Sequence, residues 1–184
     1  MPAEPTFLIL PGLFNSGPEH WQTRWQSLLP KVERVEQQSW DAPLRADWVA
    51  VLDAHLAAID GPVVLVGHSL GSITAVHWAQ HGAGKVVGAL LVAPADVERD
   101  GAPAPIVNFA PIPLAPLPFP TIVVASDDDP YAAIERSEQL AAAWGAELVR
   151  LPGAGHINGE SGLADWPQGR ALLAQLAEMH AGAN

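Results

Sequence analysis

Residues 63–71 read VVLVGHSLG, and this stretch decides the fold. Its first four residues are apolar and mostly β-branched, which predicts a strand buried on both faces of a sheet. The G-x-S-x-G pattern at 67–71, called the serine turn below, is typical of a sharp turn from a strand into a helix. Only small residues fit at Gly67 and Gly71, because the backbone folds tightly around Ser69. We therefore expect an exposed Ser69 hydroxyl at the carboxyl end of a central strand, where open α/β sheets bind ligands.

On either side of this turn, short apolar runs alternate with stretches of helical spacing. This alternation predicts an α/β fold with a mostly parallel sheet and helices on both faces. We expect about six strands and about five helices, in a single domain over 1–184. The expected strands are 7–10, 32–37, 63–66, 86–92, 122–125 and 147–151, and the expected helices are 18–29, 44–59, 70–81, 131–144 and 167–180.

The charge and composition of the chain exclude several classes of function. Its 184 residues include 20 acidic and 9 basic side chains, a formal net charge of −11 at pH 7. This charge disfavours binding to nucleic acid or to an anionic membrane. The longest apolar run, Val86–Pro94, is far shorter than the ~20 residues that span a bilayer, and no signal peptide is evident, so we expect a cytoplasmic protein. The absence of cysteine excludes disulfides, thiol catalysis and thiolate–metal sites.

A proline-rich segment interrupts the alternation of strands and helices. Seven prolines occur from Pro103 to Pro120, a density that neither a helix nor a central strand tolerates. We expect an ordered, extended excursion over the surface. Two roles remain open for it: it flanks the functional site, or it is a simple connection of polyproline character.

Candidate partners for the serine follow two later strands. A serine nucleophile needs a base to accept its proton and a carboxylate to orient that base. Three consecutive aspartates at 127–129 follow the expected strand 122–125, and His156 lies in a glycine-rich loop after the expected strand 147–151. Serine, aspartate and histidine occur in the chain order of α/β-hydrolases, each after a strand, and so predict a catalytic triad.

Together these motifs resemble the α/β-hydrolase superfamily, and more specifically the small serine hydrolases related to retinoblastoma-binding protein 9. The resemblance covers nearly the whole chain. It rests on the serine turn, LPGL at 10–13, GPEHW at 17–21, the DDP turn at 128–130 and GHIN at 155–158. It implies a compact α/β-hydrolase fold without a separate cap domain.

The resemblance also implies roles for individual residues. Ser69 is the expected nucleophile, His156 the expected base, and Asp129 the expected acid that orients the histidine. Hydrolases of this fold bind the oxyanion with two backbone N–H groups, which correspond here to those of Leu13 and Leu70. The expected reaction is hydrolysis of a carboxylic ester or related acyl bond of a small molecule through an acyl-enzyme, with no cofactor and no metal.

Alternatives remain open for several of these assignments. Asp129 precedes a proline that can open a helix, so it could be an N-cap, and Asp127 or Asp128 would then be the acid. The same triad would serve a small peptidase or amidase, and the fold could instead belong to an interaction protein. His68 is expected to point away from the serine hydroxyl and to support the turn by packing or hydrogen bonding.

Other histidines and the tryptophans have simpler explanations. His77 and His81 have the spacing of zinc ligands on a helix, but no H-E-x-x-H glutamate and no cysteine accompany them. Five of the 7 tryptophans fall in expected helices and are assigned to the core. Trp166 follows His156 closely enough to reach the site, although nothing in the sequence requires it to.

Overall fold

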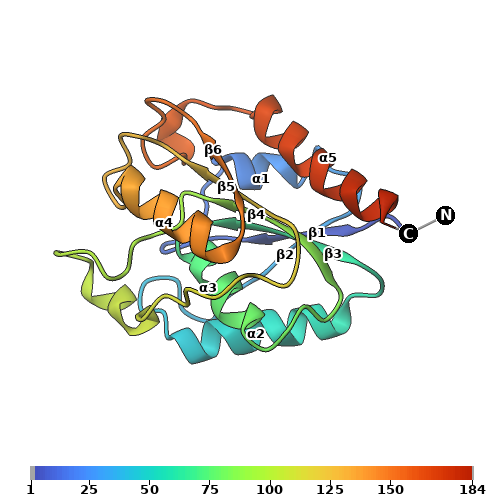
Figure 1. The fold of residues 1–184 in the computed structure, drawn as a ribbon, viewed down its shortest axis with the longest axis horizontal. Helices are drawn as coiled ribbons and strands as arrows, with labels where there is room; N and C mark the ends of the chain where they lie inside the picture. Colours follow the sequence, from blue (N-terminus) through green and yellow to red (C-terminus); the bar gives the residue numbers. More distant parts are fainter. Residues whose placement is uncertain (1–2, 184) are drawn as a thin grey trace.

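The computed structural model describes residues 3–183, which form six strands and five α-helices around one sheet (Figure 1). The strands are β1 (Thr6–Leu10), β2 (Val32–Arg34), β3 (Val63–His68), β4 (Val86–Val92), β5 (Thr121–Ala125) and β6 (Glu147–Arg150). The helices are α1 (Trp21–Trp25), α2 (Arg45–Ala58), α3 (Leu70–Ala79), α4 (Ile134–Trp144) and α5 (Pro167–Gly182), with short 3-10 helices η1 (Ala104–Phe109) and η2 (Gly159–Ser161).

All six strands are parallel, and their order in the sheet is β2-β1-β3-β4-β5-β6. The chain moves outward from β1 to β2, returns to place β3 on the other side of β1, and then continues in the opposite direction. The order therefore reverses between β1 and β3, and in open α/β sheets ligands bind at the carboxyl ends of such strands. The predicted α/β-hydrolase fold with helices on both faces is confirmed.

Two apolar layers hold the helices onto the sheet. Residues alternate between the faces of a strand. Leu65 belongs to the apolar layer that contains residues of α2, α3 and α4, whereas Val64 and Val66 belong to the layer that contains residues of α1 and α5. In Figure 1 α1 and α5 lie above the sheet, and α2 and α3 lie below it. The tryptophans of these helices are buried as predicted, including Trp48 at 2% exposure and Trp144 at 1%.

Helices α1 and α4 differ from their predicted bounds by three or more residues, for local reasons. Helix α1 was expected over 18–29 but ends at Trp25. The next three N–H groups donate to carbonyls three residues earlier, as in the tighter turns of a 3-10 helix, and Pro30 follows soon after. Helix α4 was expected to begin at Tyr131 but begins at Ile134. The backbone groups of Tyr131 are bonded outside the helix: its N–H donates to the Asp129 carboxylate and its carbonyl accepts from the Arg99 guanidinium.

The proline-rich segment is only partly extended. Residues Ala104–Phe109 form the 3-10 helix η1, which contradicts the expectation of a purely extended path. Pro105 is accommodated because it lies in the first turn, where its missing N–H would have no partner inside the helix. Ile106 and Phe109 are buried, and they anchor the segment to the core beside α3.

Candidate active site

Ser69 lies at the tip of the serine turn between β3 and α3 in a strained backbone conformation, with φ 53° and ψ −119°. Its N–H donates to the carbonyl of Val92 at the end of β4, which holds the turn in place. A Cβ at Gly71 would lie 2.1 Å from the Leu10 carbonyl oxygen, and one at Gly67 would lie 2.9 Å from Ser72. The glycines are therefore required by close packing, and such strain persists only where the surroundings enforce it.

The structure brings Ser69, His156 and Asp129 together. The Ser69 Oγ lies 2.9 Å from His156 Nε2, and His156 Nδ1 lies 2.9 Å and 3.0 Å from the two carboxylate oxygens of Asp129. A neutral imidazole that donates its Nδ1–H to the carboxylate presents an accepting Nε2 to the hydroxyl. The Asp129 side chain is only 3% exposed and that of His156 is 11% exposed, so water competes little for these bonds.

The three neighbouring aspartates have different partners. Asp129 also accepts from the Tyr131 N–H, which fixes its carboxylate toward His156. Asp127 accepts from the Gly153 N–H and Asp128 from the Gly155 N–H, so both bind the backbone of the loop that carries His156. Hydrogen bonds, the first from the Ser126 hydroxyl, lower the pKa of Asp128. Asp129 does not cap helix α4, because α4 begins at Ile134 and its N-cap residue is Ala133.

The two residues with the predicted donor N–H groups lie in the loop after β1 and at the start of α3. Leu70 is the first residue of α3, so its N–H has no carbonyl partner within the helix. Gly12 packs directly on the turn, since a Cβ there would lie 3.1 Å from both Leu70 N and Ser69 Cβ. Leu13 follows Gly12, and both leucines line the same cavity as Ser69. The two residues that carry the predicted N–H donors thus line the space in front of the hydroxyl.

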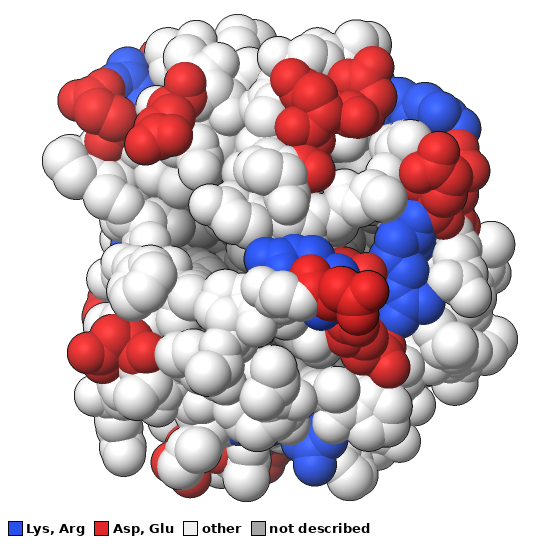
Figure 2. Space-filling model, turned by 90° about the vertical axis from the view of Figure 1, so that its left-hand side faces the viewer, with Lys and Arg blue, Asp and Glu red and all other residues white. Residues whose placement is uncertain are grey.

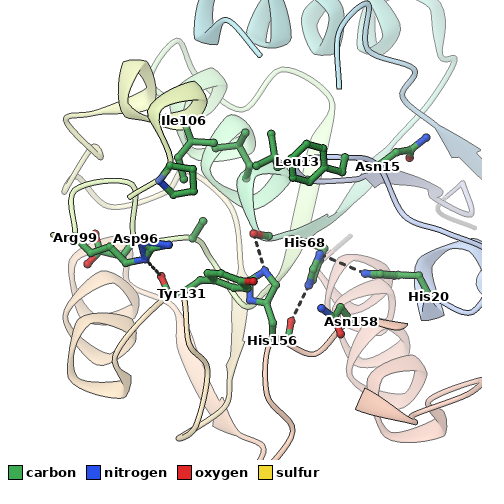
Figure 3. A pocket seen from close by; sticks show the side chains of 16 residues that line it. Leu13, Asn15, His20, His68, Asp96, Arg99, Ile106, Tyr131, His156 and Asn158 are labelled. Carbon is green, nitrogen blue, oxygen red and sulfur yellow. Dashed lines mark hydrogen bonds between the residues drawn. The ribbon is translucent and has the colours of Figure 1, made fainter. Parts of the chain in front are cut away.

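A cavity of about 260 Å³ opens in front of Ser69 at the carboxyl ends of the strands. Figure 2 views this side, where a hollow is bordered largely by uncharged surface, with acidic and basic side chains mixed along one flank. In Figure 3 Leu13 and Ile106 lie across the cavity from Tyr131 and His156. Its apolar lining residues are Leu13, Phe14, Leu70, Ala95, Pro103, Ile106 and Tyr131, and its polar ones include Asn15, Asp96, Arg99 and Asn158.

The residues that line the cavity can be compared with those predicted from the sequence. Pro103 and Ile106 come from the proline-rich segment, so of its two open roles the structure supports the flank of the site. Tyr131 and Arg99 were not predicted; the Arg99 guanidinium lies 5.5 Å from the centre of the Tyr131 ring. Trp166 is buried against Trp21 and Trp25 and is not among the lining residues.

Two further histidines, His68 next to His156 and His20 next to His68, also line the cavity. His68 makes a supporting hydrogen bond, as expected, because its Nε2 lies 2.9 Å from the His156 carbonyl oxygen. Its Nδ1 lies 3.3 Å from His20 Nε2. The part played by His20 was missed, because the only signal, the GPEHW segment at 17–21, gives no spatial partner for it. Burial is the main cause that lowers the pKa of His20 to about 3, with Arg34 adding to it, and burial also lowers the pKa of His68 well below its ordinary value.

These lowered pKa values predict that the protein is destabilised by acid. The unfolded chain binds protons at both histidines below their ordinary pKa of 6.5, whereas the folded chain keeps them neutral. The contribution of these two histidines to stability is therefore complete well above pH 6.5 and falls as the pH drops through and below it, by up to ~1.4 kcal/mol per pH unit for His20. Urea unfolding at several pH values between 7.5 and 5 measures the slope. His20→Asn should have the shallower slope, and an equal slope in both proteins would contradict this.

The described residues 3–183 include no group of three or more His, Asp or Glu side chains placed to hold a metal ion. His77 instead bonds with Nε2 to the Phe109 carbonyl oxygen at 2.7 Å. Within the same residues, no helix is both long enough and apolar enough to cross a membrane.

The fold and the site define the α/β-hydrolase class of protein: the sheet has the order of that class, a strained serine follows β3, and an aspartate and a histidine follow β5 and β6. The family model described as serine hydrolase matches residues 7–175. The chain therefore belongs to the serine hydrolase family.

Several solved structures are similar to this chain. A YdeN-like hydrolase from Pectobacterium atrosepticum is 36% identical, with a TM-score of 0.86, over 96% of this chain and 92% of that chain. The ydeN product of B. subtilis is 20% identical, with a TM-score of 0.79, over 94% and 98% of the two chains. Est1E from Butyrivibrio proteoclasticus, in a structure with bound ferulic acid, shares the fold at 14% identity and a TM-score of 0.69 over 97% and 88%. None of the curated proteins matches the chain.

Proposed function

We propose that the protein hydrolyses carboxylic esters or related acyl bonds of small molecules through an acyl-enzyme on Ser69, without a metal or cofactor. The observation that carries this proposal is the continuous series of hydrogen bonds from Ser69 Oγ through the His156 ring to the Asp129 carboxylate. Membership of the serine hydrolase family supports it. Within that family, we group the chain with the small hydrolases related to retinoblastoma-binding protein 9.

Acylation begins when Ser69 Oγ attacks the carbonyl carbon of the substrate. The hydroxyl proton passes to His156 Nε2, and the Asp129 carboxylate stabilises the imidazolium that forms. Negative charge develops on the carbonyl oxygen, where the N–H groups of Leu13 and Leu70 donate to it. Because these donors belong to the backbone of the turn and of the β1 loop, little reorganisation is needed at the moment of reaction.

Collapse of the tetrahedral intermediate breaks the bond to the leaving group. His156 gives its proton to the departing alkoxide, which leaves as an alcohol, and the acyl group stays on Ser69. Water then attacks the acyl carbon while His156 Nε2 accepts one of its protons. The second collapse releases the carboxylic acid and returns the proton to Ser69 Oγ, so the enzyme is regenerated.

The cavity walls predict how the rate depends on acyl chain length. Leu13, Pro103, Ile106 and Tyr131 offer apolar contacts near Ser69, and each buried methylene contributes ~0.8 kcal/mol. If the acyl chain binds there, kcat/KM should rise about fourfold per methylene until the cavity is filled. Its volume of about 260 Å³ is small, so long acyl chains should gain nothing further.

Rates with p-nitrophenyl acetate, butyrate, hexanoate and decanoate test this dependence, with aminoacyl p-nitroanilides measured beside them. Ile106→Ala enlarges the cavity and should shift the optimum toward longer chains, whereas Val107→Ala changes an exposed neighbour on η1 that is not among the lining residues. A flat series would contradict binding of the acyl chain to these walls. Faster hydrolysis of the anilides would replace the esterase assignment by a peptidase.

A further inference from the structure

Three histidine residues, His156, His68 and His20, are connected in a row beside the reacting atoms (Figure 3). His20 Nδ1 lies 3.1 Å from the Gln22 N, and His20 Nε2 lies 3.3 Å from His68 Nδ1. His68 Nε2 lies 2.9 Å from the carbonyl oxygen of His156. We call His20 and His68, with the His156 carbonyl that they reach, the histidine chain.

The proton positions in this chain follow from its two ends. The Gln22 N–H can only donate, so His20 Nδ1 accepts, and a neutral His20 then carries its proton on Nε2. At the other end the His156 carbonyl can only accept, so His68 Nε2 is the donor and its Nδ1 is free to accept from His20. Both ends give the same result: each of the two histidines is neutral and protonated on Nε2.

The surroundings keep both rings in that state. His20 and His68 are each 5% exposed, and Trp21 packs against both rings. Burial is the main cause that favours the neutral form of both rings, and the charges of Arg34 and His156 at His20, and of His20 and His156 at His68, act in the same direction. The hydrogen bond to the His156 carbonyl acts in the opposite direction at His68, but burial outweighs it. A proton on either ring would also place two donors face to face within the chain.

The loop that carries His156 is held at two successive carbonyls. His68 donates to the carbonyl of His156, and Trp21 Nε1 donates to that of Ile157 at 2.8 Å. His68 at the end of β3 and Trp21 at the start of α1 thus hold two carbonyls of this loop, while Asp127 and Asp128 accept hydrogen bonds from two of its N–H groups. A displacement of about 1 Å in a reacting group can cost a hundredfold in rate.

We propose that His20 and His68 are positioning residues for the hydrolysis: His20 sets the tautomer of His68, and His68 in that tautomer holds the His156 carbonyl. This rests on the proposed function of Ser69 and His156. If His68 carried its proton on Nδ1 instead, an Nε2 lone pair would face the carbonyl oxygen, and the loop would lose its support. Outer partners of this kind, where they orient groups in metal sites, contribute about ten- to a hundredfold.

Three substitutions separate this role from packing and capping. His20→Asn keeps an oxygen near the Nδ1 position to accept from the Gln22 N–H, but removes the donor to His68. His68→Gln places an amide N–H near the Nε2 position, where it can still donate to the His156 carbonyl, whereas His68→Asn is too short to reach it. His81→Asn, an exposed change beyond the far end of α3, is the matched control.

We expect kcat for a p-nitrophenyl ester to fall about tenfold in His20→Asn and about ten- to a hundredfold in His68→Asn. His68→Gln should recover most of the activity lost in His68→Asn, and His81→Asn should match the unsubstituted protein. Recovery by glutamine is the result that a purely structural role would not produce. Circular dichroism of each variant reports whether it is folded.

The tautomers are measured on the unsubstituted protein, independently of activity. ¹⁵N-edited NMR of the histidine rings should show His20 and His68 neutral with Nε2 protonated, and His68 should change its tautomer balance in His20→Asn. Protonation of His68 on Nδ1 in the unsubstituted protein would overturn the proposal. So would kcat within twofold of the unsubstituted value in both His20→Asn and His68→Asn, provided that hydrolysis requires Ser69. Absence of hydrolysis in the unsubstituted protein would refute the proposed function instead, and the NMR result would still decide the tautomers.

Discussion

Replacing Ser69 by alanine is expected to lower kcat for ester hydrolysis by roughly six orders of magnitude, the size of loss that follows removal of a serine nucleophile. The hydroxyl is the atom that forms the acyl-enzyme, and His156 Nε2 then has no proton to accept from it. Leu13 and Leu70 would still offer their N–H groups to a substrate carbonyl, so a residual rate above that of water is expected. Rates and labelling by a fluorophosphonate probe measure the loss.

The backbone at Ser69 offers a control for folding. Its φ of 53° is a conformation that glycine adopts readily and alanine does not. Ser69→Gly should therefore be as inactive as Ser69→Ala but more stable than it by about 1 kcal/mol, because the strain is relieved. Equal loss of activity with unequal stability would assign the effect to the hydroxyl. Fluorophosphonate labelling that survives in both variants would contradict the assignment of Ser69 as nucleophile.

The core of the fold could be predicted because its strands are buried on both faces. β1, β3, β4 and β5 are short apolar runs, and such runs in a chain that alternates strands and helices leave few arrangements. The ends of α1 and α4 could not be predicted, since they depend on which backbone groups are already bonded elsewhere. At Tyr131 those partners include Arg99, which lies 32 residues away in the sequence.

The candidate site was predictable where chemistry is tied to a local motif. The serine turn and the histidine after β6 belong to strand ends, which parallel pairing brings to one edge of the sheet. The histidine chain was not predictable, because His20 and His68 are 48 residues apart and their contact exists only in the folded chain. The same holds for Ile106, which reaches the cavity through the path of the proline-rich segment.

The choice among the three aspartates gives the second large prediction. Asp129→Asn should lower kcat by about four orders of magnitude, as loss of the triad acid does where the geometry is kept. An asparagine amide that donates toward His156 Nδ1 would favour the tautomer protonated on Nε2, which cannot accept the Ser69 proton. KM should change little, since Asp129 is not among the residues that line the cavity.

Asp127→Asn and Asp128→Asn are matched controls, because each removes one negative charge from the same turn. Asp127 and Asp128 accept from the N–H groups of Gly153 and Gly155, and an asparagine oxygen can still accept those bonds. We therefore expect losses of less than about tenfold from either change, through local charge alone. Measuring kcat for the three purified variants on one ester decides between them. If Asp127→Asn or Asp128→Asn is the inactive variant while Asp129→Asn retains activity, the carboxylate that contacts His156 is not the one that the reaction uses.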